Sequence, residues 1–428
     1  MKNIFVFGLD EFNLSQLQTL RGAEGYRFLE LFSHDEVKAG PEFPVQRLLE
    51  GAREKLDAFP DTVDAIVGYW DFPVSTLLPL LRAPLGLPSP SFEAVLKCEH
   101  KYWSRVLQKE VVPEQVPNFC SVDPFQENPR QQITLDYPFW LKPVKSAGSY
   151  LGFKVRNDAE FRQAIGRIRK GIHRFGRPFN YLLAQAQLPE AIAAVDGNHC
   201  IAEQIISRGR QCTQEGYVYQ GETVVYGTID SIREGRHRSS FSRYQYPSRL
   251  PRRVQQRMTD ITCRVMTHFG YDTAPFNIEF YWDEAQDSLF LLEINARISK
   301  SHCPLFFKVD GAYHHQVMVE IALGRRPEFP HRQGRHRMAA KFMWRESRDA
   351  LMKHVPTPRE LRDIAAQFPS AEIQLHVKEG MRLSDLPDQD SYSYEVGVIF
   401  LGGDSQKQLL EKYRACRQAI PLQLEPVD

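Results

Sequence analysis

The chain has 428 residues, of which 42% are hydrophobic and 25% charged, as is ordinary for a globular protein with a large core and two to four domains. Because 54 basic residues stand against 53 acidic ones, the net charge of +1 excludes the broad positive field expected of a nucleic-acid-binding protein. Seven scattered cysteines without a CxxC pair argue against a zinc site or a disulfide framework, and no apolar run is long enough for a signal peptide or a membrane span, so we expect a soluble cytoplasmic protein.

The first 95 residues alternate short apolar strands with helical patterns. This alternation predicts an α/β layer with parallel strands. The first turn reads GLDEFN rather than GxGxxG, so packing is favoured over a dinucleotide site. A proline-rich stretch at 79–90 ends the unit, and we place a first domain at 1–95. The expected strands lie at 3–8, 26–32 and 65–68, and a helix lies near 45–59.

A helix is predicted over residues 91–109, because Ser89 and Pro90 provide a cap and a first helical position before apolar residues recur at helical spacing. Lys101 falls opposite the apolar stripe, and periodicity alone makes it a solvated lysine. The stripe consists of Phe92, Val95, Leu96, Trp103, Val106 and Leu107.

A strand at 137–142 leads into the Ser/Gly segment SAGSYLG at 146–152. Small residues let backbone amides approach an anion closely, and Lys142 and Lys145 add positive charge. A loop that covers phosphate groups and a plain turn between strands are both compatible with this pattern. The next apolar strand, CIAEQII at 200–206, ends in backbone groups that an adenine ring can use.

The strongest pattern is a β-hairpin. Two alternating runs, Phe276 to Trp282 and Leu289 to Arg297, flank a short polar loop, and this spacing places Glu279 opposite Glu293. Facing carboxylates repel by roughly 0.2–1 kcal/mol unless a cation lies between them. A Mg²⁺ ion would remove that penalty, with Asn295 as a further oxygen ligand. An amphipathic hairpin with a simply solvated polar face is the alternative.

The arginine-rich segment at 231–253 is interpreted as a loop for an anionic substrate or as a solvated excursion. A basic junction at 331–338 then leads into a last unit with strands at 373–377 and 394–401 and a final helix near 405–420. The arginines that are candidates to pair with a substrate carboxylate are Arg233, Arg236, Arg238 and Arg243.

Four motifs in this order resemble the ATP-grasp superfamily, most closely its carboxylate–amine ligases and biotin-carboxylase-like members. They are CEHKYW with Lys101, FWLKPVKSAGS with Lys142, AEQII at 202–206 and LLEINARIS with Glu293. The resemblance implies an α/β fold in three parts. These are an N-terminal parallel α/β domain (1–95), a two-lobed ATP-grasp domain (96–330, with a nucleotide-covering lobe at about 115–202) and a small C-terminal α+β domain (331–428).

The resemblance also implies how ATP is held. Lys101 and Lys142 would bind its phosphates, and backbone groups of Gln204 and Ile206 would bind adenine, with Glu203 accepting from the amino group. Gln211 stands where many members carry an acidic residue for the ribose, so ribose would be bound neutrally. The loop that would close over the phosphates comprises Ser146, Ala147, Gly148 and Ser149.

For the metal and the chemistry, the resemblance implies that Glu279, Glu293 and Asn295 hold one or two Mg²⁺ ions, with Mn²⁺ as an alternative. Arg297 would act catalytically by stabilising an acyl phosphate, together with Lys142. No covalent enzyme intermediate is required, so Cys303 is interpreted as incidental.

The expected activity is that of an ADP-forming ligase. ATP phosphorylates a carboxylate to an acyl phosphate, and an amine displaces the phosphate to leave an amide or dipeptide-type bond. Small carboxylates and amines, amino acids above all, are the expected partners; nucleic acid and membranes are not, and a homodimer stays open. The alternatives are biotin-carboxylase-like carboxylation, for which this chain shows no AMKM carrier motif, and a non-catalytic ATP-binding module, which would not need the intact metal set.

Overall fold

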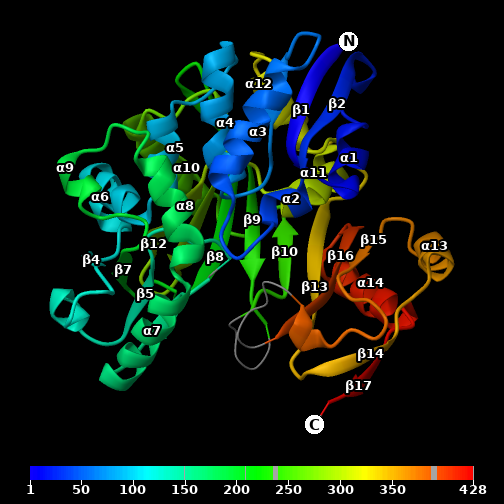
Figure 1. Cartoon of the computed structure of the whole chain (residues 1–428). Helices are drawn as coiled ribbons and strands as arrows, with labels where there is room; N and C mark the ends of the chain where they lie inside the picture. Colours follow the sequence, from blue (N-terminus) through cyan, green and yellow to red (C-terminus); the bar gives the residue numbers. More distant parts are fainter. Residues whose placement is uncertain (149, 208, 235–239, 387–392, 428) are drawn as a thin grey trace.

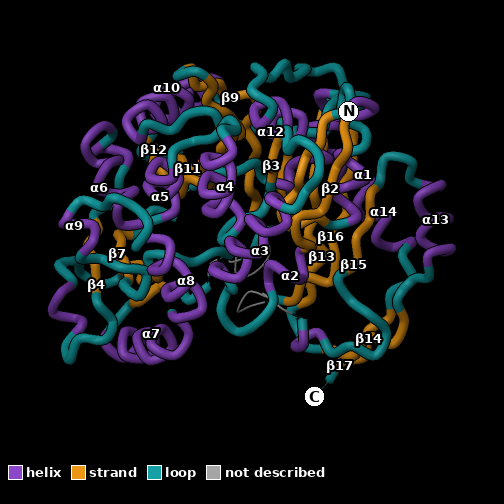
Figure 2. Tube along the Cα trace, turned by 45° about the horizontal axis from the view of Figure 1, so that its top comes forward, coloured by secondary structure: helices purple, strands orange, loops and turns teal. Residues whose placement is uncertain are grey.

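The computed structural model describes residues 1–148, 150–207, 209–234, 240–386 and 393–427. Figure 1 shows the N-terminal unit in blue, a separate lobe in teal and light green, and the C-terminal strands in orange and red, arranged around a central set of strands. In Figure 2 the strands occupy the interior and the helices lie mostly around them. Among the described residues, no helix combines the length and the hydropathy needed to cross a membrane.

The N-terminal unit is the predicted parallel α/β layer. Its sheet has the order β2-β1-β3, and both neighbours run parallel to β1. One face packs on α3 and α4, and the other packs on α1 and on α12 from later in the chain, so both faces are buried as parallel sheets require. The elements are β1 (Lys2–Leu9), α1 (Glu11–Leu17), β2 (Tyr26–Ser33), α2 (His34–Lys38), α3 (Val45–Asp57), β3 (Ala65–Val67), α4 (Val74–Arg82) and α12 (His315–Ala322).

The single helix predicted over 91–109 is wrong. The structure has two helices, α5 (Phe92–Glu99) and α6 (Lys101–Val111), separated at His100, whose backbone is extended with φ −86° and ψ 96°. The His100 imidazole accepts a hydrogen bond from the Trp103 amide and so caps α6. Because the chain changes direction here, Lys101 leaves the solvent face that a continuous helix would give it.

The lobe predicted at about 115–202 contains an antiparallel four-stranded sheet of order β4-β7-β5-β6. α7 packs on this sheet and buries Phe161, Ile165 and Ile168 against the strands. The elements of the lobe are β4 (Phe119–Val122), β5 (Phe139–Pro143), β6 (Phe153–Val155), α7 (Asp158–Gly171), α8 (His173–Leu183), α9 (Glu190–Ala193) and β7 (Cys200–Gln204).

An eight-stranded sheet of order β12-β11-β8-β9-β10-β13-β16-β15 forms the body of the molecule. It crosses the boundary predicted at 330/331, because β10 pairs with β13 and places Arg243 opposite Phe342. The domain limits stay a prediction, but one sheet joins the last two units. Its strands are β8 (Arg210–Tyr219), β9 (Glu222–Ile232), β10 (Arg243–Tyr246), β11 (Ala274–Asp283), β12 (Ser288–Asn295), β13 (Met338–Glu346), β15 (Glu372–Leu375) and β16 (Tyr394–Gly403).

Helices cover the ends of this sheet. α10 packs its apolar side on the strands that include β11 and β12, while α14 packs on β13 and β16. The two strands and the final helix predicted after residue 370 are confirmed. The remaining elements are α10 (Arg252–Phe269), α11 (Cys303–Asp310), β14 (Ala350–His354), α13 (Pro358–Gln367), α14 (Gln406–Ala419) and β17 (Gln423–Pro426).

Candidate active site

The predicted hairpin forms with the predicted register. β11 and β12 pair antiparallel, with Glu279 opposite Glu293 and Asn277 opposite Asn295. A register shift directly after Glu279 marks a bulge. The second strand ends at Asn295, so Arg297, which we expected at the end of that strand, lies just beyond it.

Electrostatics distinguish the two facing carboxylates. Burial, reinforced by the charge of Glu293, raises the pKa of Glu279 to about 7. Burial also raises the pKa of Glu293, but Lys101 and Lys142 outweigh it, so the pKa of Glu293 ends below its ordinary value. The charges of Arg297 and Arg233 act against burial at Glu279 but do not outweigh it.

Asn295 completes a set of oxygen donors. Its side-chain amide donates to Asn277 Oδ1 at 3.1 Å, which leaves its own carbonyl oxygen for a ligand. No cluster of three or more His, Cys, Asp or Glu residues in the described parts of the chain could hold a metal. Two carboxylates and one amide oxygen suit Mg²⁺, which is commonly bound by one or two carboxylates with phosphate oxygens and water. These residues therefore fit that ion.

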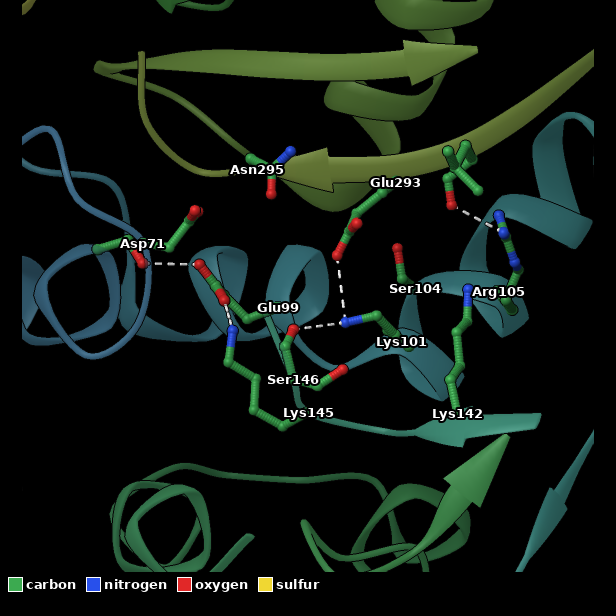
Figure 3. Close-up of polar contacts among 12 residues, drawn as sticks. Asp71, Glu99, Lys101, Ser104, Arg105, Lys142, Lys145, Ser146, Glu293 and Asn295 are labelled. Atoms are coloured by element: carbon green, nitrogen blue, oxygen red, sulfur yellow. Dashed lines mark hydrogen bonds and ion pairs between the residues drawn. The ribbon is translucent and has the colours of Figure 1, made fainter. Parts of the chain in front are cut away.

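Lys101 connects the hairpin to the Ser/Gly loop. Its Nζ lies 3.1 Å from Glu293 Oε1 and donates to the carbonyl of Ser146 at 2.9 Å (Figure 3). Only 11% of its side chain is exposed, so the solvated lysine favoured by periodicity is wrong. The break at His100 is the cause, because it directs the first residue of α6 inward.

Lys142 lies on β5 and points at the strand beside it. Its Nζ is 2.6 Å from Glu203 Oε2, while Glu203 Oε1 accepts from Arg105 Nε at 2.6 Å. Arg105 also donates to the carbonyls of Leu291 and Leu292 on β12. Arg105 and Lys142 outweigh burial and hold the pKa of Glu203 at about 2. The structure thus gives other partners to both oxygens of the residue expected to meet adenine.

The Ser/Gly loop is described from Ser146 to Gly148, whereas Ser149 lies outside the described residues. Gly148 is exposed and has φ +59°, a conformation that favours glycine. Ala147 packs against the apolar cluster shared with the N-terminal unit. The preceding Lys145 contacts Glu99 (Figure 3), and burial lowers the pKa of Lys145 to about 8.

The hinge predicted at 202–206 spans the end of β7. Gln204 is exposed and is the last residue in the strand ladder, whereas Ile206 is buried. Gln211, expected at the ribose, is 6% exposed and has protein partners. Its amide donates to Glu279 Oε2 at 2.8 Å, and its carbonyl accepts from Tyr281 Oη at 2.8 Å and from Arg233 at 2.9 Å. Gln211 thus orients the expected metal ligand Glu279.

Arg297 is held by a residue that the sequence analysis missed. Its Nε and Nη2 donate to the two oxygens of Asp71 at 2.7 and 2.8 Å, a bidentate pair. Asp71 follows β3 in the N-terminal unit, 226 residues away in sequence. No local motif marks Asp71; parallel topology, which gathers the ends of β1 to β3 at one edge, is the signal that could have found it.

A second missed feature is the buried carboxylate of Glu215 on β8. His302 Nδ1 donates to Glu215 at 2.7 Å, and the Asn277 amide donates to it at 2.6 Å. Burial raises the pKa of Glu215, but these donors and nearby His314 outweigh burial and leave it lowered. Through Asn277 the network reaches Asn295, so Glu215 sets the orientation of an expected metal ligand. Cys303 is buried, and its Sγ lies 3.8 Å from His315 Nε2; its incidental role stays a prediction.

Of the four arginines proposed to bind a substrate carboxylate, the two that the structure describes have separate protein partners. Arg243 is buried and pairs with Glu234, and Arg233 lies 3.9 Å from the Phe241 ring centroid besides bonding Gln211. Arg236 and Arg238 lie outside the described residues. A substrate-binding role for this group therefore gains no support from the two that are described.

Residues 135–304 match a family model described as "ATP-grasp domain". This segment is therefore similar to ATP-grasp domains. The resemblance predicted from the four motifs, and the α/β fold class that it implied, are thereby confirmed. The matched residues include the Ser/Gly loop, the predicted hinge and the hairpin with the expected metal ligands, but not Lys101.

Solved structures share the fold along almost the whole chain. L-amino acid ligase from Bacillus licheniformis has a TM-score of 0.75 and 16% identity, covering 100% of this chain and 99% of that one. Biotin carboxylase from Campylobacter jejuni has a TM-score of 0.66 and 14% identity, covering 99% and 92%. Phosphoribosylglycinamide synthetase from Anaerococcus prevotii has a TM-score of 0.64 and 13% identity, covering 99% and 100%.

Among curated proteins, the uncharacterized protein y4rH of Sinorhizobium fredii is 26% identical over 317 residues. The match covers 72% of this chain and 58% of the relative. The chain therefore spans little more than half the length of that relative.

Proposed function

We propose that this protein is an ATP-dependent, ADP-forming ligase that activates a carboxylate as an acyl phosphate and joins it to an amine. The observation that carries the proposal is the Glu279–Glu293–Asn295 oxygen set, with Lys101 bridging it to the Ser/Gly loop. The likeness to L-amino acid ligase along almost the whole of both chains supports this branch of the superfamily. We propose amino acids as the substrate class on the same ground.

The nucleotide would lie between the covering lobe and the eight-stranded sheet. Lys101 and Lys142 would bind phosphate oxygens as point charges, and the loop that begins at Ser146 would cover them. Backbone groups of Gln204 and Ile206 would bind adenine. Ile206 lies beyond the strand ladder, whereas the Gln204 N–H already donates to the Asn118 carbonyl at 2.9 Å, so Gln204 would use its carbonyl oxygen. Glu203 would keep Lys142 in place, and Gln211 would keep Glu279 in place.

Magnesium, held by Glu279, Glu293 and the Asn295 carbonyl, would supply charge neutralisation between the phosphates. The remaining work belongs to the chain. Arg297 is positioned by Asp71 to stabilise the charge on the acyl phosphate and on the oxygen that departs as the amine attacks. Because no nucleophilic side chain takes part, catalysis would consist of positioning, charge stabilisation and exclusion of water.

The test is phosphate and ADP release by the purified protein with ATP, Mg²⁺ and pools of amino acids, followed by single amino acids and simple carboxylic acids. We expect release that depends on both a carboxylate and an amine, with mass spectrometry showing the amide. Glu293→Gln should abolish release. Glu284→Gln, an exposed change in the loop of the same hairpin, should leave it intact.

Two other results would point to a different function. Release stimulated by bicarbonate and a biotinylated acceptor would identify carboxylation instead. ATP binding without release under any substrate pool would identify a non-catalytic nucleotide-binding module. Turnover that Glu293→Gln leaves unchanged would falsify the metal assignment.

A further inference from the structure

Two lysines from different parts of the chain, Lys300 and Lys341, lie near the proposed reaction centre, and neither is in direct contact with a carboxylate of the described residues. We propose that Lys300 and Lys341 bind a substrate carboxylate other than the one that is phosphorylated. The inference rests on the proposed ligase function and narrows its substrates to those that carry a second, non-reacting acid group.

Lys300 lies three residues beyond Arg297, where the chain leaves the metal hairpin. Its Nζ is 3.2 Å from the centroid of the Trp70 ring, and the indole is fixed because its N–H donates to the Gly8 carbonyl at 2.7 Å. Among the described residues, no carboxylate forms an ion pair or a hydrogen bond with Lys300. A half-buried amino group is therefore held over an aromatic face, and no carboxylate of the described residues touches it directly.

Lys341 on β13 meets the same segment from the C-terminal side. Its Nζ donates to the hydroxyl of Ser301 at 3.0 Å, which places it next to the residue that follows Lys300. The nearby carboxylate of Glu395 already contacts Arg345 at 2.9 Å and His376 at 3.6 Å. Within the described parts of the chain Lys341 has no carboxylate within ion-pair distance, and its side chain is only half-buried.

The carboxylates whose charges act on the two lysines are already engaged by other groups: Asp10 by Asn13, Asp71 by Arg297 and Glu395 by Arg345. Burial lowers the pKa of Lys300 to about 7; the charges of Asp10 and Asp71 act against burial, and those of Lys341 and Lys38 add to it. On the other face of the same region, His34 stacks on Trp70 with 3.8 Å between ring centroids, and its Nε2 is buried without a hydrogen-bond partner. An anion between the lysines would relieve their repulsion.

A carboxylate fits this site because each of its two oxygens can accept from one ammonium group, while the aliphatic part of the substrate lies along Trp70. In an amide-forming reaction such a group has two sources. It is either the α-carboxylate of the amino acid that acts as the amine, or a side-chain carboxylate of the acid that is phosphorylated. The lysines would bind either carboxylate in the same way. Comparing substrates with and without each carboxylate shows which of the two is bound.

The kinetic test compares wild type with Lys300→Met, Lys341→Met and Lys109→Met, the last being an exposed lysine on α6. We expect KM for the substrate that carries the second acid group to rise at least tenfold in the first two variants, with KM for ATP unchanged and Lys109→Met like wild type. Two comparisons show which carboxylate is bound. Alanine is compared with alaninamide as the amine, which tests the α-carboxylate, and aspartate is compared with asparagine as the acid, which tests the side-chain carboxylate. Equal use of both members of both pairs, with unchanged KM in the lysine variants, would overturn the proposal.

A binding measurement keeps this result separate from the ligase proposal. Succinate is titrated calorimetrically into each protein without ATP, so that no turnover is needed. We expect binding by wild type, Lys109→Met and Lys300→Arg, and loss of binding in both lysine-to-methionine variants, with thermal unfolding confirming that each variant is folded. No binding by wild type, or equal binding by all folded variants, would refute the site even if phosphate release is observed.

Discussion

Arg297 shows how a single side chain is prepared for its proposed task. A guanidinium group next to phosphate has many available orientations, but here Asp71 binds it through two parallel hydrogen bonds. Burial lowers the pKa of Arg297, but the charge of Asp71 outweighs burial and raises it, so the guanidinium group stays protonated. Because Asp71 belongs to the N-terminal unit, that unit contributes directly to the candidate site.

We predict that Arg297→Met lowers kcat by about 100- to 1,000-fold, because it removes a charge that acts on the acyl phosphate. Asp71→Asn keeps Arg297 but removes its bidentate partner and should lower kcat by about 10- to 100-fold. ATP affinity, measured by calorimetry, should change little in both. Asp61→Asn, an exposed change in the same unit, is the control. A loss of ATP affinity larger than the loss of kcat would contradict these roles.

At the scale of elements, the start of β8 depends on a close approach between backbones. Gly209 has φ +90°, and a Cβ atom built on it would lie 2.1 Å from the Trp282 carbonyl oxygen on β11. A glycine here lets β8 begin directly against β11, which fixes Gln211 beside Glu279. The start of one strand thus positions an expected metal ligand on the next.

We predict that Gly209→Ala destabilises the protein by more than Gly221→Ala. Gly221 also has positive φ, +78°, but its Cβ would meet open space, so alanine costs only backbone strain of about 1–2 kcal/mol. At Gly209 the same strain is joined by a clash with a carbonyl that cannot move without breaking the strand ladder. Urea unfolding of both variants measures the difference, and equal midpoints would contradict the role given to Gly209.

At the scale of the whole molecule, neutral histidines are buried in three separate places. Burial lowers the pKa of His34, His100 and His314 to about 4 each, from an ordinary value of 6.5. Between these values the unfolded chain binds protons that the folded chain does not, so the free energy of unfolding falls as the pH falls from 6.5 towards 4. Glu279 has the opposite effect, because burial raises its pKa to about 7 and the folded chain then binds a proton that the unfolded chain does not. It is one group against three histidines.

We therefore predict that the free energy of unfolding is lower at pH 5 than at pH 7 by a few kcal/mol, since each such group contributes up to about 1.4 kcal/mol per pH unit. Urea titrations at the two pH values measure this change. His100→Asn retains a residue that can cap α6 and removes one titrating group, so its stability should depend less on pH. An unchanged dependence in that variant would show that His100 does not contribute.

The sequence by itself determined the features that depend on local pattern. Alternation of strand and helix predicted the parallel N-terminal sheet, and period-two alternation predicted the hairpin with Glu279 opposite Glu293, because side-chain direction follows directly from strand periodicity. Four short motifs in order predicted the ATP-grasp domain. These inferences need only neighbours in sequence.

Tertiary structure alone decided the contacts that join distant segments. The break at His100 turned Lys101 from solvent to Glu293, and Asp71 reached Arg297 from another unit. The pairing of β10 with β13 merged two predicted domains into one sheet. Such contacts follow from how whole elements pack, and packing energy is shared among many residues, so no short stretch of sequence encodes them.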